Sequence, residues 1–227
     1  MTPELHHEYL KAMGVERWVV RGKAEEIAAD SVPEQVSEGA GPVVPDWSSL
    51  EAQVSACKKC QLHESRTQTV FGTGNRDADW LIIGEAPGAE EDRQGEPFVG
   101  RAGKLLTEML FAAGLQRTDV YIANILKCRP PANRDPAPDE VACCRAYLQQ
   151  QIDLIQPQLI LVVGRIAAHS LLQTDCQLGR LRGKVHHYGE TNIPVIVTYH
   201  PAYLLRSPLE KRKVWSDLQI AKSLKKQ

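Results

Sequence analysis

Polar side chains that could carry chemistry follow the apolar runs of this 227-residue sequence. The stretch GEAPGAEED comes directly after the apolar residues 80–83 and holds four carboxylates in nine residues, among them Glu85 and Glu91. Phe98, Asn124 and His200 stand further along the chain. Carboxylates repel phosphate, so this acidic turn is a poor phosphate cradle. The set suits a polar heterocycle better than a phosphate group.

These side-chain types together suit the cleavage of an N-glycosidic bond. The amide of Asn124 can pair with the edge of a base, and the ring of Phe98 can stack on its face. The imidazole of His200 can donate to an oxygen that gains negative charge, and a carboxylate can orient water or balance a sugar cation. Structural alternatives stay open: Phe98 and His200 could be buried in the core, Asn124 could end a strand, and the acids could be solvated.

The sequence marks of several common enzyme classes are absent. The chain contains no G-x-G-x-x-G, no G-x-x-x-x-G-K-[ST] and no G-x-S-x-G pattern, which speaks against dinucleotide-binding, P-loop and hydrolase-elbow sites. The formal net charge of -1 excludes a globally basic nucleic-acid binder, although 27 lysines and arginines can still form local patches.

Five of the six cysteines lie where they could form one metal or cluster site. Cys57 and Cys60 form a C-x-x-C pair, Cys128 ends an apolar run, and Cys143 and Cys144 stand together early in a helical stretch. Disulfides are not expected in the reducing cytosol, so zinc or an iron-sulfur cluster is the first hypothesis. The sixth cysteine, Cys176, stands apart and is expected to be a small buried hydrophobic residue.

Helical spacing separates the two adjacent cysteines. Cys144 shares the three-and-four spacing of Val141, Leu148 and Ile152, which predicts one buried face. Cys143 is turned roughly 100° away from that face. The spacing places Cys144 on the buried face and leaves open which of the two is the fourth ligand.

Alternating strands and helices must position these residues. Apolar, β-branched runs predict four strands, at residues 80–83, 120–126, 159–163 and 194–199. Helices are expected at residues 102–113 and 138–155. This alternation predicts an α/β fold, a three-layer α/β/α arrangement around a central four-stranded parallel sheet. Ligands bind beyond the carboxyl ends of such strands, and the polar residues named above lie there.

The chain is expected to divide near residue 46. Residues 1–45 contain a short amphipathic start and then a stretch rich in Glu, Ala, Ser, Gly and Pro, as in a flexible linker. Residues 46–227 are expected to form one domain. No apolar run approaches the roughly 20 residues that span a bilayer, and the first residues lack the pattern of a signal peptide. We expect a cytosolic, nucleoid-associated protein.

Several ordered motifs extend over residues 47–218. They are C-x-x-C from Cys57, VFGxGN from Val70, GEAPGAEED, GxPFVGRAG from Gly95, NxxKCRPPxNR from Asn124, LRG from Leu181 and HPAYLLR from His200. This set resembles the family 4 uracil-DNA glycosylases, the iron-sulfur branch of that superfamily. The resemblance implies a uracil-DNA glycosylase-like fold and an enzyme that releases uracil from DNA at the start of base excision repair.

The resemblance also implies roles for individual residues. Four cysteines would bind a [4Fe-4S] cluster of mainly structural role: Cys57, Cys60, Cys128 and Cys144. Three residues after the first strand would border the uracil pocket: Gly84, Glu85 and Ala86. Phe98 would stack on the base, Asn124 would read its edge, and His200 matches the histidine of the second glycosylase motif.

We expect hydrolysis without a covalent lysine intermediate and without strand cleavage. His200 would donate to the uracil oxygen on which charge develops. Glu85 is the first choice for positioning the water and facing the sugar cation, and Glu91 is the second. An Asn124 amide that accepts from N3–H and donates to O4 would mismatch cytosine.

The opened DNA also needs contacts, because the base must leave the stack. Residues that could enter the gap or hold phosphates are Leu204, Leu205, Arg182, Lys184 and Arg206. The alternatives for them are core packing and a solvated helix face. The expected partner is uracil-containing DNA, single- or double-stranded, bound by a monomer. Residues 1–45 could contact a replication or repair partner.

Two other functions stay open. One is a relative of the same superfamily that binds or traps uracil-DNA, although no inserted histidine-bearing loop stands near Asn133. The other is a non-catalytic [4Fe-4S] module that associates with damaged DNA. Turnover on uracil-containing DNA distinguishes them.

Overall fold

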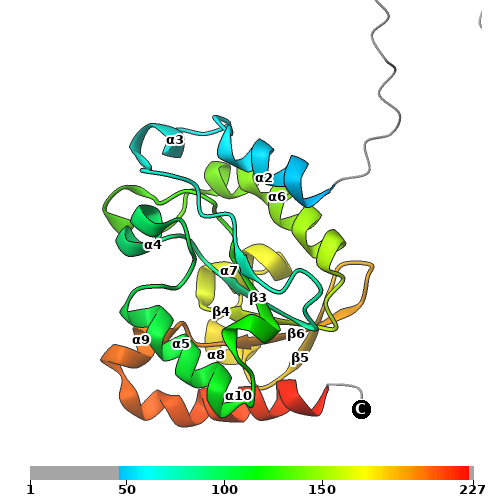
Figure 1. Ribbon diagram of the computed structural model, residues 1–227. Coiled ribbons are helices and arrows are strands. Elements are labelled where there is room, and N and C mark those ends of the chain that lie inside the picture. The colour runs from blue at the N-terminus through cyan, green and yellow to red at the C-terminus, as the bar shows by residue number, and fades with distance from the viewer. Residues whose placement is uncertain (1–45, 225–227) are drawn as a thin grey trace, which may run out of the picture. The chain divides into compact units, whose positions relative to one another are not determined.

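The computed structural model describes residues 46–224 (Figure 1). The predicted N-terminal extension and linker, residues 1–45, lies outside the described residues, as do residues 225–227. Asp46 caps helix α2 (Trp47–Ser55), because its side chain accepts a hydrogen bond from the backbone N–H of Ser49. A short helix, α3 (Leu62–Ser65), follows α2.

A six-stranded sheet with the order β1-β3-β2-β4-β6-β5 forms the centre of the described fold. Its four inner strands are parallel: β3 (Val120–Asn124), β2 (Trp80–Gly84), β4 (Leu159–Val163) and β6 (Ile193–Thr198). Two strands pair antiparallel at the edges: β1 (Thr73–Gly74) and β5 (Val185–Tyr188). The four predicted strands are confirmed. The sheet has six strands and not the four that were predicted. The two edge strands were missed because one has only two residues and the other has the sequence VHHY, so neither forms an apolar run.

Helices cover both faces of the sheet (Figure 1). One face is covered by α5 (Arg101–Ala112), α9 (Pro201–Arg206) and α10 (Lys211–Ser223). The other face is covered by α6 (Pro138–Ile155), α7 (Arg165–Leu172) and α8 (Leu178–Leu181). The three-layer arrangement is therefore confirmed. The remaining elements are α4 (Ala89–Gln94) and the 3-10 turns η1 (Arg117–Asp119), η2 (Pro131–Asn133) and η3 (Pro208–Glu210).

The side chains of the inner strands alternate between two cores. On β2, Trp80 and Ile82 pack toward α5 and α10, whereas Leu81 and Ile83 pack toward α6 and α7. All four are at most 2% exposed. Strands buried on both faces need continuous apolar runs, which is why the sequence predicted them well.

The carboxyl ends of the parallel strands meet at one edge. Gly84 at the end of β2 stands opposite Asn124 at the end of β3. Gly164, after β4, donates its backbone N–H to the carbonyl oxygen of Thr198 at the end of β6 (3.0 Å). His200 follows two residues later and caps the N-terminus of α9. No helix within residues 46–224 is long and apolar enough to cross a membrane.

Candidate active site

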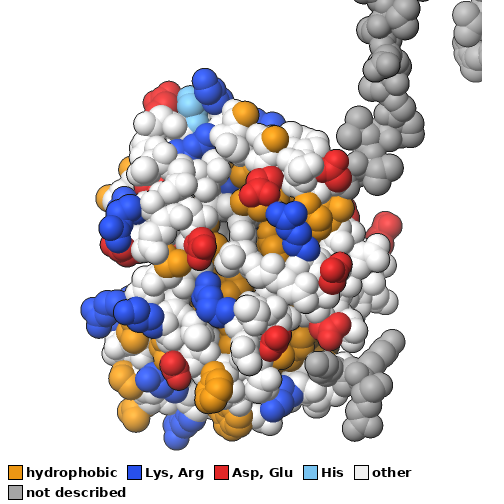
Figure 2. All heavy atoms as spheres, in the orientation of Figure 1, with side chains coloured by type: hydrophobic (Ala, Val, Ile, Leu, Met, Phe, Trp, Pro, Cys, Tyr) orange, Lys and Arg blue, Asp and Glu red, His pale blue; other side chains and the backbone are white. Residues whose placement is uncertain are grey.

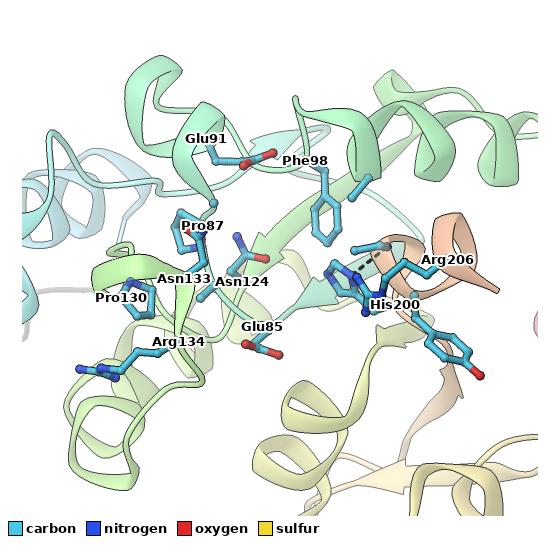
Figure 3. A pocket seen from close by; sticks show the side chains of 15 residues that line it. Glu85, Pro87, Glu91, Phe98, Asn124, Pro130, Asn133, Arg134, His200 and Arg206 are labelled. Atoms are coloured by element: carbon cyan, nitrogen blue, oxygen red, sulfur yellow. Dashed lines mark hydrogen bonds between the residues drawn. The ribbon is translucent and has the colours of Figure 1, made fainter.

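A cavity of about 520 Å³ opens at this edge of the sheet (Figure 3). It is lined by Glu85, Ala86, Pro87, Gly88, Glu91, Phe98, Ala102, Asn124, Pro130, Asn133, Arg134, His200, Ala202, Tyr203 and Arg206. The structure thus brings together the residues predicted for catalysis and substrate binding. Gly84 does not line the cavity but lies directly against Asn124 and Phe98.

Asn124 lines this cavity and carries an unpaired acceptor. The residue is 2% exposed, and its Oδ1 has no hydrogen-bond partner among the described residues. A buried acceptor without a partner costs about 1–3 kcal/mol, so the amide is suited to bind a ligand. The backbone oxygen of Asn124 accepts from Nζ of the buried Lys127 (2.9 Å), which also donates to Oε1 of Gln151 (2.6 Å). These bonds fix the strand end that carries the amide.

Glycine at position 84 leaves room for both the amide and the aromatic ring. A Cβ atom there would lie 2.4 Å from Oδ1 of Asn124 and 2.6 Å from the ring of Phe98. Both separations are far below van der Waals contact. Any side chain at this position would displace the two groups.

Phe98 adopts a strained backbone conformation. It has φ 55°, in the left-handed region, which costs a non-glycine residue about 1–3 kcal/mol and is common at functional sites. A Cβ atom at Gly103 would lie 1.7 Å from the carbonyl oxygen of Phe98, so α5 packs tightly against this residue. The ring centroid lies 5.6 Å from that of His200, and Figure 3 shows the ring pointing toward His200 and Asn124.

His200 is held as a neutral hydrogen-bond donor. Its Nδ1 accepts from the backbone N–H of Ala202 (3.1 Å), so the proton of the neutral ring resides on Nε2. Burial, together with the nearby Arg206, lowers the pKa of His200 to about 4, and Glu91 opposes the shift. The ring also packs against Gly164, where a Cβ atom would lie 3.2 Å from Cβ of His200.

Glu85 is partly protonated near neutral pH. Burial raises its pKa to about 7, Asp135 raises it as well, and Arg165 lowers it. Figure 3 shows its carboxylate on the opposite side of the Asn124 amide from Glu91.

Glu91 faces the same cavity but is bonded to the backbone. Its Oε1 accepts from the backbone N–H groups of Val99 and Gly100, both at 2.9 Å. These are the residues immediately before α5, so the carboxylate stabilises the start of that helix.

A second, small cavity brings five cysteines together: Cys57, Cys60, Cys128, Cys143 and Cys144. They come from the loop between α2 and α3, the loop after β3 and helix α6. Nη1 of Arg66 donates to Sγ of Cys128 (2.9 Å), and Sγ of Cys143 lies 3.4 Å from the carbonyl oxygen of Lys59. Within residues 46–224, no group of three or more His, Cys, Asp or Glu side chains is arranged to hold a single metal ion. The all-thiol donor set itself fits an iron-sulfur cluster, which is held by cysteine thiolates.

The predicted DNA-contacting residues fall into two groups. Arg206 lines the active-site cavity, and Leu205 and Lys184 are exposed. Leu204 is 0% exposed and belongs to the core between α5 and α10, so it is not available for insertion into DNA. Because neighbouring helical residues point in different directions, α9 turns Leu204 inward and Leu205 outward.

Arg182 is engaged within the fold. Its Nη2 donates to Oδ2 of Asp217 (2.6 Å), and its guanidinium carbon lies 4.4 Å from the centre of the Tyr199 ring. The side chain is 10% exposed. Figure 2 shows other basic side chains interspersed with hydrophobic ones over α5, α9 and α10.

One wall of the cavity carries residues for which the sequence suggested no role. Asn133 and Arg134 line it from the η2 loop, where Ala132 and Asn133 both have positive φ. Two nitrogens of Arg134 donate to the two carboxylate oxygens of Glu140 (2.9 and 2.5 Å), which fixes the loop against α6. The turn-forming sequence PPANR was the available signal for this wall.

Comparisons with known proteins agree with this geometry. The sequence model of the uracil DNA glycosylase superfamily matches residues 71–219. The type-4 uracil-DNA glycosylase of Archaeoglobus fulgidus is 47% identical over 174 residues, which cover 74% of this chain and 87% of that protein. That of Thermotoga maritima is 43% identical over 179 residues, which cover 77% and 92%. A type-5 uracil-DNA glycosylase of Thermus thermophilus is 33% identical over 118 residues, which cover 45% and 53%. The chain therefore belongs to the uracil-DNA glycosylase superfamily, among the type-4 glycosylases.

Proposed function

We propose that the protein is a uracil-DNA glycosylase that hydrolyses the N-glycosidic bond of an extruded uracil and leaves an abasic site. The observation that carries this proposal is the buried Asn124 amide, which lines a cavity of about 520 Å³ and whose Oδ1 has no hydrogen-bond partner within residues 46–224. The similarity to type-4 uracil-DNA glycosylases supports the same activity.

Asn124 would select uracil by its hydrogen-bonding edge. Its Oδ1 would accept from N3–H, and its Nδ2 would donate to O4. Cytosine presents an acceptor and a donor in the reversed order, so it would leave buried polar groups unpaired. Phe98 would stack on the face of the base. The wall formed by residues 85–89 is the candidate for excluding the methyl group of thymine by shape.

Two opposite charges develop as the bond lengthens, one on the base and one on the sugar. His200, neutral and protonated at Nε2, would donate to the uracil oxygen that gains negative charge. A preorganised donor of this kind is worth roughly 3–4 kcal/mol in the transition state. The carboxylate of Glu85 would face the sugar cation and orient the attacking water. Glu91 remains the second choice for this role, because its Oε1 already accepts two backbone hydrogen bonds.

We also propose that the chain holds a [4Fe-4S] cluster through Cys57, Cys60, Cys128 and Cys144. When bound, the cluster would supply a structural cross-link between three segments of the chain. Cys144 is favoured over Cys143, since it is 3% exposed and packs with Leu62 and Leu126, whereas Cys143 is half-buried.

Uracil-containing DNA would bind across the rim of the active-site cavity. Extrusion of the base costs a few kcal/mol, and Leu205, which is exposed in α9, would occupy the gap. Arg206 and Lys184 would contact phosphates, whereas Arg182 is committed to Asp217. Residues 46–227 would make up the catalytic domain.

An oligonucleotide with a single uracil tests this function. After incubation, alkali cleaves the strand at abasic sites, and the product is counted against the enzyme. We expect many products per enzyme and no strand cleavage before alkali. A ceiling of one product per enzyme would instead indicate a uracil-trapping relative, and no product would indicate a non-catalytic module.

A further inference from the structure

Arg117 lies outside the residues that line the cavity, but it binds the segment that carries Phe98. Its Nη2 donates to the backbone oxygen of Pro97 (2.9 Å), and its Nη1 donates to the backbone oxygen of Phe98 (3.2 Å). One planar guanidinium therefore holds two consecutive carbonyl groups, a geometry that lysine cannot reproduce.

Phe98 requires such support because of its left-handed backbone, φ 55°. A strained conformation persists only where the surrounding structure imposes it. The close packing of Gly103 against the carbonyl oxygen of Phe98 is one such restraint. The hydrogen bond from Arg117 to the same oxygen is a second.

Glu91 holds the other half of the segment. Its Oε1 accepts from the backbone N–H groups of Val99 and Gly100. Residues 97–100 are thus restrained by two side chains of opposite charge, an arginine on two carbonyls and a glutamate on two amides. Charge-assisted hydrogen bonds of this kind are stronger than neutral ones.

Arg117 is itself well positioned. It begins η1, which is closed by reciprocal capping between Gln116 and Asp119; the backbone N–H of Gln116 donates to Oδ2 of Asp119 (2.7 Å). The next element is β3, which ends at Asn124. A short segment therefore connects Arg117, which holds the backbone of Phe98, with Asn124, whose amide would read the base.

We propose that Arg117 is a positioning residue for base recognition: its guanidinium holds the carbonyls of Pro97 and Phe98 so that the Phe98 ring is oriented for stacking on the base. The inference rests on the proposed glycosylase function and assigns to Arg117 no contact with DNA or uracil. Arg117 acts through the Phe98 ring, so it should not change the binding of a DNA ligand that places no base in the cavity.

The first test compares Arg117→Met, Arg117→Lys and the control Arg93→Met. Arg93 is 69% exposed and forms a surface ion pair with Glu90 within α4. We expect Arg117→Met to lower kcat/KM for uracil release and to weaken inhibition by free uracil, each about ten- to a hundredfold. Affinity for an oligonucleotide with a preformed abasic site should stay at the wild-type value. Arg117→Lys should lose nearly as much, and Arg93→Met should match the wild type.

A double-mutant cycle then asks whether Arg117 acts through the ring. Once Phe98→Ala has removed the ring, adding Arg117→Met should cause no further loss. The inference would be overturned if the losses in kcat/KM of the two single variants multiplied in the double variant. It would also be overturned if Arg117→Met weakened the binding of abasic-site DNA as much as it weakened inhibition by uracil. Unchanged activity in both Arg117 variants would overturn it as well. If Arg117→Met does not fold, as judged by its thermal midpoint, Arg117→Lys decides the question.

The wild-type protein separates this inference from the proposed function. If the wild type releases no uracil, the proposed function fails. If the wild type is active and the Arg117 variants behave like it, only the role of Arg117 is wrong.

Discussion

Burial acts in opposite directions on the pKa values of the two titratable side chains that would stabilise the transition state. It lowers the pKa of His200 to about 4 and raises the pKa of Glu85 to about 7. In both cases the low-dielectric surroundings favour the neutral form. His200 therefore stays uncharged across the neutral range, and Glu85 is the group whose charge changes there.

Activity should follow the ionisation of Glu85. Because its raised pKa keeps the carboxyl protonated below about pH 7, the single-turnover rate of uracil release should rise as pH increases through that value. Glu85→Gln should be much slower and should lose this rise. A wild-type rate that is flat between pH 6 and pH 8 would remove Glu85 from the proposed role.

Two charged neighbours of Glu85 should shift its pKa in opposite directions when each is removed. Asp135 raises the pKa of Glu85 and Arg165 lowers it, and the two form an exposed ion pair at 2.9 Å. Asp135→Asn should therefore shift the midpoint of the pH–rate profile to lower pH, and Arg165→Met should shift it to higher pH. Shifts in the same direction would contradict this electrostatic account.

The positions of site residues were predictable from the sequence where a motif carried them, and not where they depend on a partner far along the chain. Asn124 ends β3, His200 caps α9 and Phe98 lies in the loop before α5, and the structure brings all three together in one cavity. The buried pair of Arg182 and Asp217 joins residues 35 positions apart. No local pattern announces such a pair.

Two glycines differ in the space around them. Tight contact at the end of β2 should make glycine essential at position 84, whereas open space should make it dispensable at position 179. Gly84→Ala would put a Cβ atom 2.4 Å from Oδ1 of Asn124, and the displaced amide should lower kcat/KM roughly a hundredfold. Gly179 in α8 has open space around its Cβ position. Gly179→Ala should leave activity unchanged and raise stability by up to about 1 kcal/mol. Equal kcat/KM values of the two variants would show that a side chain at position 84 does not displace the Asn124 amide.

A largely buried ion pair links α10 to the residue that follows α8. Asp217 is 1% exposed and accepts from both Arg182 and Thr198. Arg182→Met leaves this carboxylate without its charged partner, which should cost about 3–5 kcal/mol and lower the thermal midpoint by roughly 6–20 °C. The exposed Lys184 serves as control, since Lys184→Met should change stability by about 0.5 kcal/mol at most. If Arg182→Met is as stable as Lys184→Met, the pair does not hold α10.

Buried strands and helices were predictable from the sequence, whereas the half-exposed edge strand β5 was not. β4 (Leu159–Val163) and α6 (Pro138–Ile155) have the predicted bounds, because the strand is buried on both faces and the helix has a regular apolar face. β5 is half exposed and polar, and it forms by pairing with β6 at the sheet edge. Its strand conformation comes from a tertiary contact and leaves no apolar run to detect.

For the whole molecule, the cysteine cavity joins segments that are distant in the sequence. Cys57→Ser or Cys128→Ser should therefore abolish the broad visible absorbance of an iron-sulfur cluster and lower the thermal midpoint. Cys176 is exposed, so the expectation that it is buried was wrong, and it lies outside this cavity. Cys176→Ser should therefore keep the full iron and sulfide content. Native protein that contains zinc and no iron would contradict the cluster assignment.

We expect this cavity to hydrolyse the bond between uracil and deoxyribose, and free uracil is the direct product of that reaction. Mass spectrometry should quantify bases released from matched oligonucleotides that carry uracil, cytosine or thymine at one position. We predict one free uracil for every abasic site, many per enzyme molecule, and no release of cytosine or thymine. His200→Ala and Asn124→Ala should be strongly impaired. Uracil that never exceeds the amount of enzyme, or normal release by both variants, would contradict the account.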